Sequence, residues 1–213
     1  MSDMHFYEPS QGHRLPHCPL KAIVAPRPIG WISTVDVQGK VNLAPYSFFN
    51  FVCEAPPILY FSSTGWKDSA QNVKDTGEFV ANLATRPLAE AMNISSAMVP
   101  PEVDEMQLAG LASAPSRLVK PPRVAQAPAA FECKLISITQ IRDLDDKPSD
   151  SFMVMGQVVG VHINQDFLRD GLFDTAAART IARCGYRGYY AEVAEMFEMM
   201  RPSETSAVEK GAA

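Results

Sequence analysis

Arg27-Pro-Ile-Gly-Trp-Ile-Ser-Thr-Val-Asp36 and the following Asn42-Leu-Ala-Pro-Tyr-Ser-Phe-Phe-Asn50 form the stretch that decides the fold of this chain. Its two apolar runs flank a turn at Val37-Gln-Gly-Lys40, which is the pattern of a β-hairpin. Hydroxyl and amide side chains interrupt both runs where a purely structural strand usually carries Val or Ile. Such side chains on a rigid hairpin suit an uncharged, planar ligand that is rich in hydrogen-bonding groups. The hairpin is therefore a candidate cofactor cradle.

Length and composition narrow the class of protein. The 213 residues, 46% hydrophobic and 20% charged, are typical of one globular domain with a well-buried core. The net charge of −5 and the absence of a Lys/Arg stripe argue against nucleic acid as a partner. No apolar run reaches the roughly 20 residues that cross a bilayer, and the N-terminus lacks the pattern of a secretory signal. We therefore expect no membrane partner and a cytoplasmic location.

Cysteines and histidines give no sign of a metal site. Cys18, Cys53, Cys133 and Cys184 are widely spaced, without a C-x-x-C pair, which is typical of reduced thiols. The four histidines form no zinc-binding pattern. We expect no metal.

Strand-like segments dominate the chain. They are rich in Val, Ile, Phe and Tyr, and turns or short helices separate them. The segments are Ile29–Val35, Val41–Phe51, Ile58–Ser63, Phe79–Leu83, Phe131–Ile141 and Phe152–Ile163. This spacing favours a mainly β protein, an antiparallel barrel or sandwich, over repeated βαβ units.

Helices are predicted as short inserts. Asp68 or Ser69 can cap a helix over 70–75 that ends before Gly77. The other predicted helices are 87–92 after the cap Thr85, 103–109 before Gly110, and 175–181 after the cap Asp174. Four prolines between 114 and 128 predict an extended connection. We expect an N-terminal extension over 1–24, one domain over 25–200, and a disordered tail over 201–213.

Further motifs follow the hairpin in a characteristic order. They include Lys67-Asp-Ser69 with Asn72, Thr76-Gly-Glu-Phe-Val80, Met92-Asn-Ile-Ser-Ser96, Val119-Lys-Pro-Pro-Arg123 and Ile181-Ala-Arg-Cys-Gly-Tyr186. In this combination the chain resembles the flavin reductase-like FMN-binding proteins, which include flavin reductases and flavoprotein oxygenases. The resemblance implies a six-stranded antiparallel split β-barrel with short helical inserts. It also implies a homodimer with FMN at the subunit interface.

An FMN phosphate needs positive charge and N–H donors, preferably at the start of a helix. Lys67 and Ser69 supply an ammonium group and a hydroxyl at a predicted helix start, and Asn72 follows one turn later. Arg27 is either a second phosphate contact or a structural anchor of its proline-rich segment. Arg183 is either a contact to a phosphate or substrate carboxylate, or half of a salt bridge.

The resemblance also implies contacts to the flavin ring and the ribityl chain. These fall on Ser33, Thr34, Asn42, Ala44 and Ser47, with Ser62 and Ser63 as further candidates. Asn42 and Ser47 can instead close the hairpin through local side-chain-to-backbone bonds. Trp31 is interpreted as a core residue or a wall of the cofactor cavity.

No catalytic residue is identified, because flavin carries out the hydride chemistry in such enzymes. His162 is a candidate proton donor, although a structural histidine is the commoner outcome in an alternating strand. Many family reductases carry Gly-Asp-His before this strand, where this chain reads Pro148-Ser-Asp-Ser-Phe152. The departure leaves the docking of a nicotinamide open.

The leading hypothesis is an NAD(P)H-dependent flavin reductase that passes hydride through bound flavin to free flavin, oxygen or a partner monooxygenase. The first alternative is a flavoprotein oxygenase or oxidase that acts directly on a small organic substrate. The second is a non-catalytic flavin-binding module for electron transfer.

Overall fold

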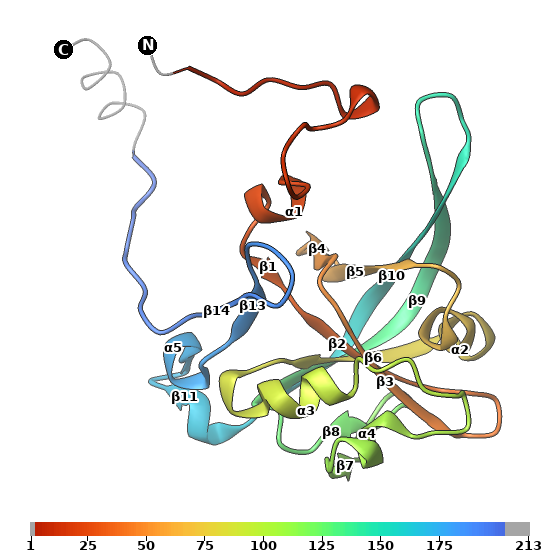
Figure 1. Cartoon of the computed structure of the whole chain (residues 1–213). Coiled ribbons are helices and arrows are strands. Elements are labelled where there is room, and N and C mark those ends of the chain that lie inside the picture. The colour runs from red at the N-terminus through yellow and green to blue at the C-terminus, as the bar shows by residue number, and fades with distance from the viewer. Residues whose placement is uncertain (1–2, 203–213) are drawn as a thin grey trace.

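A curled antiparallel sheet forms the centre of the protein, whose computed structural model describes residues 3–202 (Figure 1). The strand order is β3 (Val41–Tyr46), β2 (Gly30–Val35), β6 (Glu78–Leu83), β9 (Ala129–Arg142), β10 (Pro148–Ile163), β5 (Ile58–Thr64) and β4 (Phe49–Cys53). The predicted mainly β, antiparallel split-barrel fold is confirmed, with seven strands instead of six.

The additional strand comes from residues 41–51, which were predicted as one strand. The chain bends at Ser47 and Phe48, so that β3 pairs with β2 whereas β4 pairs with β5. These two strands are the opposite edges of the curled sheet. The prediction of one strand is wrong because a straight strand cannot pair with both sides of the opening. The bend places residues 44–48 at the split of the barrel.

All four predicted helices occur, with different bounds. Helix α2 (Asp68–Thr76) begins two residues early, and its N-cap is Lys67, so the predicted caps Asp68 and Ser69 are wrong. Gly77 ends it in the left-handed conformation at φ 74°, as predicted. The short α4 (Glu105–Leu108) and α5 (Thr175–Ala178) are capped by the side chains of Asp104 and Asp174. The rest of 175–181 is not helical, because Ile181 begins a strand.

The remaining elements are short. The segment after Thr85 folds as η2 (Arg86–Leu88) and α3 (Ala89–Ile94). The others are η1 (Pro9–Gln11), α1 (Leu20–Ile23), β1 (Arg27–Pro28), β7 (Ser113–Ala114), β8 (Arg123–Val124), η3 (Gln165–Phe167), β11 (Leu168–Arg169), β12 (Leu172–Phe173), β13 (Ile181–Arg183) and β14 (Tyr190–Glu192). Strands β1, β13 and β14 form a second small sheet, which brings residues 181–192 beside the N-terminal end of the hairpin.

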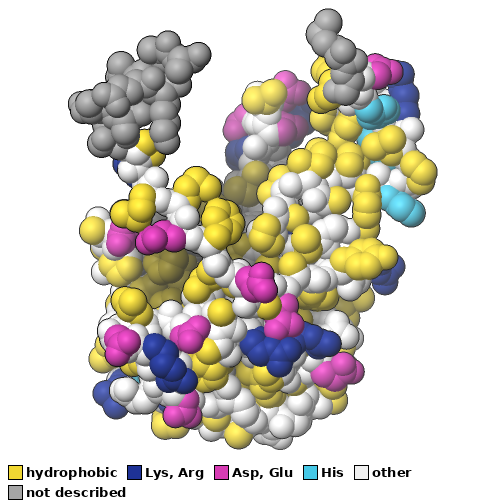
Figure 2. All heavy atoms as spheres, turned by 90° about the vertical axis from the view of Figure 1, so that its left-hand side faces the viewer, with side chains coloured by type: hydrophobic (Ala, Val, Ile, Leu, Met, Phe, Trp, Pro, Cys, Tyr) yellow, Lys and Arg dark blue, Asp and Glu magenta, His cyan; other side chains and the backbone are white. Residues whose placement is uncertain are grey.

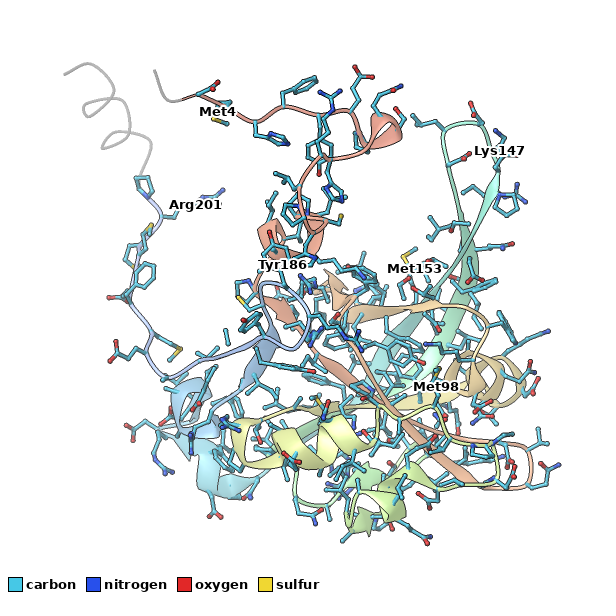
Figure 3. The ribbon with its side chains drawn as sticks, in the orientation of Figure 1. Met4, Met98, Lys147, Met153, Tyr186 and Arg201 are labelled. Carbon is cyan, nitrogen blue, oxygen red and sulfur yellow. The ribbon has the colours of Figure 1, made fainter. Side chains whose placement is uncertain are left out.

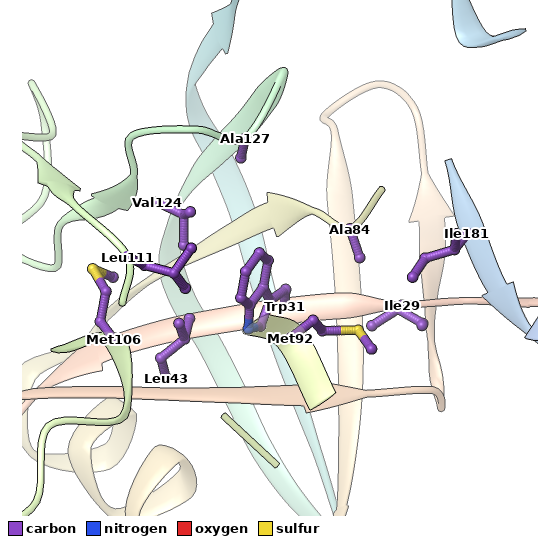
Figure 4. Packing of buried hydrophobic residues seen from close by; sticks show 10 residues of the cluster. All are labelled: Ile29, Trp31, Leu43, Ala84, Met92, Met106, Leu111, Val124, Ala127 and Ile181. Atoms are coloured by element: carbon purple, nitrogen blue, oxygen red, sulfur yellow. The ribbon is translucent and has the colours of Figure 1, made fainter. Parts of the chain in front are cut away.

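Strand β2 separates two hydrophobic clusters because all six of its residues are buried. Alternate side chains of a strand point to opposite faces. Trp31 accordingly packs in the cluster of Figure 4 with Leu43 and Met92, which confirms its interpretation as a core residue. Its neighbour Ile32 packs in the other cluster with Phe61, and α2 covers that cluster through Val73.

The proline-rich segment 114–128 is an extended connection, as predicted, apart from the short β7 and β8. Buried side chains of the barrel hold its backbone. Both oxygens of Glu132 accept backbone N–H groups, from Arg117 at 2.7 Å and from Leu118 at 2.6 Å. The amide oxygen of Asn82 accepts the N–H of Val124 at 2.8 Å.

Apolar side chains are exposed at both ends of the chain, and Figure 2 shows hydrophobic groups over the upper part of one face. Helix α1 exposes Ile23 and Val24, and the extended segment after β14 exposes Met196, Phe197 and Met200. Within residues 3–202, no helix is long and apolar enough to cross a membrane. Most of the predicted tail, residues 203–213, lies outside the described residues.

Candidate functional site

A cleft of about 280 Å³ lies where the start of α2 approaches β3. Its third wall is the loop between α3 and α4. The lining residues are Asn42, Ala44, Pro45, Tyr46, Lys67, Asp68, Ser69, Ser95, Ser96, Ala97, Met98, Val99 and Glu105. Four of the residues predicted from the sequence therefore share one cleft, namely Asn42, Ala44, Lys67 and Ser69.

The N-terminus of α2 is open toward this cleft. The first N–H groups of a helix have no partner within the helix, and the N-cap residue usually supplies one. Here the N-cap is Lys67, whose side chain makes no capping bond. Free N–H groups, the positive end of the helix dipole and a lysine ammonium therefore occur together. This combination is the usual protein environment for a phosphate.

A network of amides and hydroxyls supports the floor of the cleft. The Asn42 amide donates to the Ser69 hydroxyl at 2.9 Å and to the Thr34 hydroxyl at 3.2 Å. The Asn72 amide also donates to Thr34, at 3.1 Å. Thr34 and Asn72 are buried and thus hold Asn42 and Ser69 in place from behind.

Two buried acids beside the cleft titrate above their usual ranges. Burial raises the pKa of Tyr46, and its buried hydroxyl has no hydrogen bond of normal geometry to the described residues, although Ser69 and Ser63 lie close by. Burial also raises the pKa of Glu105, whose carboxylate accepts the N–H of Leu43 at 3.0 Å. Burial thus disfavours the charged form of each group.

A second cleft of about 390 Å³ adjoins the first, because Pro45 and Ser96 line both. It contains two more of the predicted residues, Ser47 and Arg183. The Arg183 guanidinium lies 4.7 Å from the ring centre of Tyr190. Taken together, the two clefts are large enough for a ligand about half the size of a dinucleotide.

Ser33 does not line either cleft. Its hydroxyl donates to the carbonyl oxygen of Pro122 at 2.5 Å and accepts from the Asn82 amide. The side chains of Ser33 and Thr34 lie on opposite faces of β2, so only Thr34 faces the α2 side.

Arg27 and the β5 serines also lie outside the two clefts. The Arg27 guanidinium donates to the carbonyls of Lys21 and Val24 and lines a separate apolar cleft of about 400 Å³ beside Phe48. The Ser63 hydroxyl donates to the carbonyl of Gly65 at 2.8 Å, and Ser62 pairs with β10.

His162 lies at another cleft of about 400 Å³, on the strands β9 and β10. Its Nε2 contacts a carboxylate oxygen of the fully buried Glu132. Burial acts to raise the pKa of Glu132, but hydrogen bonds from His162, Arg117 and Leu118 outweigh it, and the pKa lies below the usual range. Neither residue lines the clefts at α2, so the structure does not bring His162 to the candidate site.

Several lining residues were not predicted from the sequence. The loop 95–99 contributes Ser95 to Val99, including the fully exposed Met98 (Figure 3). Arg187 and Asn93 line the second cleft. The polar run Asn93-Ile-Ser-Ser96 was a possible signal, whereas nothing local marks Arg187. Among residues 3–202, no group of His, Cys, Asp and Glu is arranged to hold a metal.

Relatives by sequence cover most of this chain. A protein of Deinococcus radiodurans is 38% identical over 194 residues, which is 85% of this chain and 82% of the relative. A protein of Aquifex aeolicus is 36% identical over 173 residues, or 78% of this chain and 85% of the relative.

Solved structures share the fold. Nitrilotriacetate monooxygenase component B from Bacillus cereus is 27% identical with a TM-score of 0.83, over 93% of this chain and 100% of that chain. The 2-nitrobenzoate 2-nitroreductase of Pseudomonas fluorescens is 26% identical with a TM-score of 0.76, over 87% and 89%. Flavoredoxin of Desulfovibrio vulgaris, 20% identical with a TM-score of 0.71 over 86% and 94%, shares the fold.

The family model described as "Flavin reductase like domain" matches residues 24–182, which is well over half of the sequence. The chain therefore belongs to the flavin reductase-like family.

Proposed function

We propose that this protein is an FMN-dependent oxidoreductase, specifically an NAD(P)H-dependent flavin reductase. The observation that carries the proposal is the uncapped start of α2, with Lys67 and Ser69, in a cleft that opens into a second one along β3. Membership of the flavin reductase-like family supports a flavin as the ligand.

The residues of the first cleft, together with the adjoining Ser47, fit FMN. The free N–H groups of α2, Lys67 and Ser69 suit a phosphate, and Asn42 suits the hydroxyls of a ribityl chain. Strand β3 is an edge of the sheet, so part of its backbone near Ala44, and that of Ser47 just after it, is available to bond the edge of a planar ring. Thr34 and Asn72 act indirectly by orienting Asn42 and Ser69.

In this mechanism, the residues of the protein bind and orient the cofactor. Lys67, Ser69 and Asn42 would hold FMN, which would supply the hydride and electron transfer between a nicotinamide and free flavin, oxygen or a partner protein. The fixed network at Asn42 and the buried wall at Tyr46 hold the cofactor in one position and exclude water from one side.

We also propose a homodimer whose interface includes the exposed apolar face, a partner monooxygenase as electron acceptor, and a cytoplasmic location. The likeness to a monooxygenase component at 27% identity supports the partner. The exposed apolar side chains of α1, β4 and the segment after β14 support the dimer. The free thiols of all four cysteines support the location.

A second candidate function is that of a flavoprotein oxygenase or oxidase that acts directly on a small organic substrate. The chain departs from the Gly-Asp-His motif of many family reductases and reads Pro148-Ser-Asp-Ser-Phe152 in this region. A similar structure, at 26% identity, is that of a nitrobenzoate nitroreductase. Anaerobic mixing of the FMN-loaded protein with NADH and with NADPH discriminates. Rapid bleaching of the flavin absorbance supports the reductase, and no bleaching with either supports the second candidate.

Titration with FMN, followed by the quenching of its fluorescence, tests the cofactor site. Lys67→Ala is expected to weaken FMN binding about tenfold, or roughly 1.4 kcal/mol, because it removes one charge-assisted contact to the phosphate. The matched control is Lys74→Ala in the last turn of the same helix, which should bind FMN like the wild type. Equal losses in both variants, or a wild type that does not bind FMN, would contradict the proposal.

A further inference from the structure

The second cleft is a site of positive charge in an acidic protein. The whole chain carries a net charge of −5, yet two arginines and no carboxylate line this cleft. Its other polar lining residues, Ser47, Asn93, Ser96 and Tyr190, all carry hydrogen-bond donors. The lining therefore matches an anion better than a cation or an apolar ligand.

Among residues 3–202, the two arginines of the second cleft, Arg183 and Arg187, have no ion pair and no side-chain hydrogen bond. Glu192 of the neighbouring β14 accepts from Arg179 at 2.6 Å and lies 4.0 Å from Arg86. Those two arginines are exposed and neutralise the only acid of β14. The charges of the cleft arginines remain available to a ligand.

Tyr190 orients one of these charges. Arg183 and Tyr190 are direct partners in the register of β13 and β14, and the guanidinium lies 4.7 Å from the ring centre. A planar guanidinium next to an aromatic ring loses little freedom when it binds a carboxylate or phosphate through two N–H groups. Arg187 follows in an exposed turn, where it can approach the same anion from solvent.

The position of the second cleft, beside the proposed FMN site, indicates that the anion is part of a second reactant and not of FMN. Pro45 and Ser96 separate this cleft from the one at α2, where the proposed FMN phosphate already has Lys67 and the helix start. We propose that Arg183 and Arg187 bind an anionic group, a phosphate or carboxylate, of the molecule that exchanges electrons with the flavin. This inference rests on the proposed FMN function. The anion has two possible sources, the pyrophosphate of a nicotinamide dinucleotide or the carboxylate of an organic acid.

Calorimetric titration of the FMN-loaded protein distinguishes these sources. ADP serves as the pyrophosphate probe and benzoate as the carboxylate probe, with uncharged adenosine and benzamide as their matched controls. Arg183→Met and Arg187→Met are each expected to weaken the binding of one of the two anions about tenfold. Neither substitution should change the binding of the uncharged controls. Arg169→Met, which removes the same charge from the exposed strand β11, should bind the probes like the wild type.

The outcomes separate this inference from the cofactor site. A response to ADP alone identifies a nicotinamide dinucleotide, and a response to benzoate alone identifies an organic acid. If neither anion binds better than its uncharged control, or if both arginine variants bind it normally, the inference is wrong although FMN still binds. A tenfold loss of FMN affinity in Arg183→Met would also overturn it, because Arg183 would then hold the cofactor. Failure of the wild type to bind FMN at all refutes the proposed function instead.

Discussion

At the scale of single residues, Glu132 is the side chain whose burial depends most on complete hydrogen bonding. It is fully buried, and its carboxylate accepts two backbone N–H groups of the proline-rich segment and contacts the imidazole of His162. A buried carboxylate is tolerated only when its hydrogen bonds are complete. The pair therefore explains how a segment with four prolines is fixed to the barrel, and it gives His162 a structural role.

Glu132→Gln is expected to lower the free energy of unfolding by about 1–3 kcal/mol at pH 7, because the ionised acceptor of three donors is lost. The folded-state pKa of Glu132 lies below its ordinary value of 4.5. Its stabilisation is therefore present above pH 4.5 and is lost as the pH falls through the folded-state pKa. Urea denaturation at pH 7 and at pH 3 checks this. The difference between variant and wild type should shrink at pH 3.

Glu54→Gln is the matched control for this substitution, because Glu54 is exposed and the change removes the same charge. A loss of stability in Glu132→Gln that is equal at both pH values would show that the ionised carboxylate is not the source of the effect.

At the scale of elements, close packing between strands limits which residues the sheet accepts. Gly156 lies at a register shift between β10 and β9. A Cβ atom at this position would lie 2.6 Å from Cζ of Phe79 and 3.3 Å from Cβ of Cys133, and both of these residues are fully buried. The absence of a side chain at Gly156 thus lets the Phe79 ring fill the inside of the curled sheet.

Gly156→Ala is expected to destabilise the protein by about 1–3 kcal/mol, because the added methyl group displaces the ring of Phe79. Phe79→Leu should restore part of that loss in the double variant, which thermal unfolding of the four proteins of the cycle measures. Gly160→Ala on the same strand is the control, since its nearest neighbour would lie at 3.4 Å. Additive effects of Gly156→Ala and Phe79→Leu would contradict the proposed overlap.

The helices and strands also show which features of the fold the local sequence predicts. Strand segments, the helix after Lys67 and its stop at Gly77 follow from apolar periodicity and from the conformational freedom of glycine. The break at Ser47 and Phe48 does not, because no glycine marks a turn within residues 41–51. It arises from the curvature of the sheet, which is a property of seven strands and not of one segment.

At the scale of the whole molecule, the segment after β14 carries apolar side chains that are exposed to solvent. Within residues 3–202, the last backbone hydrogen bond that ties it to the body runs from the N–H of Val193 to the carbonyl of Thr180 at 2.8 Å. Beyond it, Met196, Phe197 and Met199 are 63–84% exposed. Such a run of exposed apolar side chains usually marks a contact surface.

The proposed homodimer predicts that this segment is buried by the second copy. Light scattering behind size exclusion should give a dimer for the full chain. Phe197→Asp should shift the equilibrium toward monomer at micromolar concentration, because it places a charge in the interface. The control is Leu144→Asp, at the fully exposed tip of the β9–β10 hairpin. A monomeric wild type, or an unchanged dimer in Phe197→Asp, would contradict this interface.

The sequence by itself determined the mainly β fold, the positions of most helices and the tripeptide Lys67-Asp68-Ser69 at a helix start. These features depend on neighbouring residues, so periodicity and capping rules reach them. The tertiary structure alone decided which polar residues meet. It turned Ser33 to the side of Pro122, occupied Arg27 with the carbonyls of its own segment, and added Arg183 and Arg187 to the end of β3.

The physical reason is the distance along the chain. Residues 183–190 reach the hairpin through the pairing of β1 with β13, more than 150 residues apart in sequence. No local propensity encodes such a pairing, because it depends on the summed packing of the intervening barrel. The hairpin sequence thus specifies one wall of the cleft, and only the folded chain supplies the charges beside it.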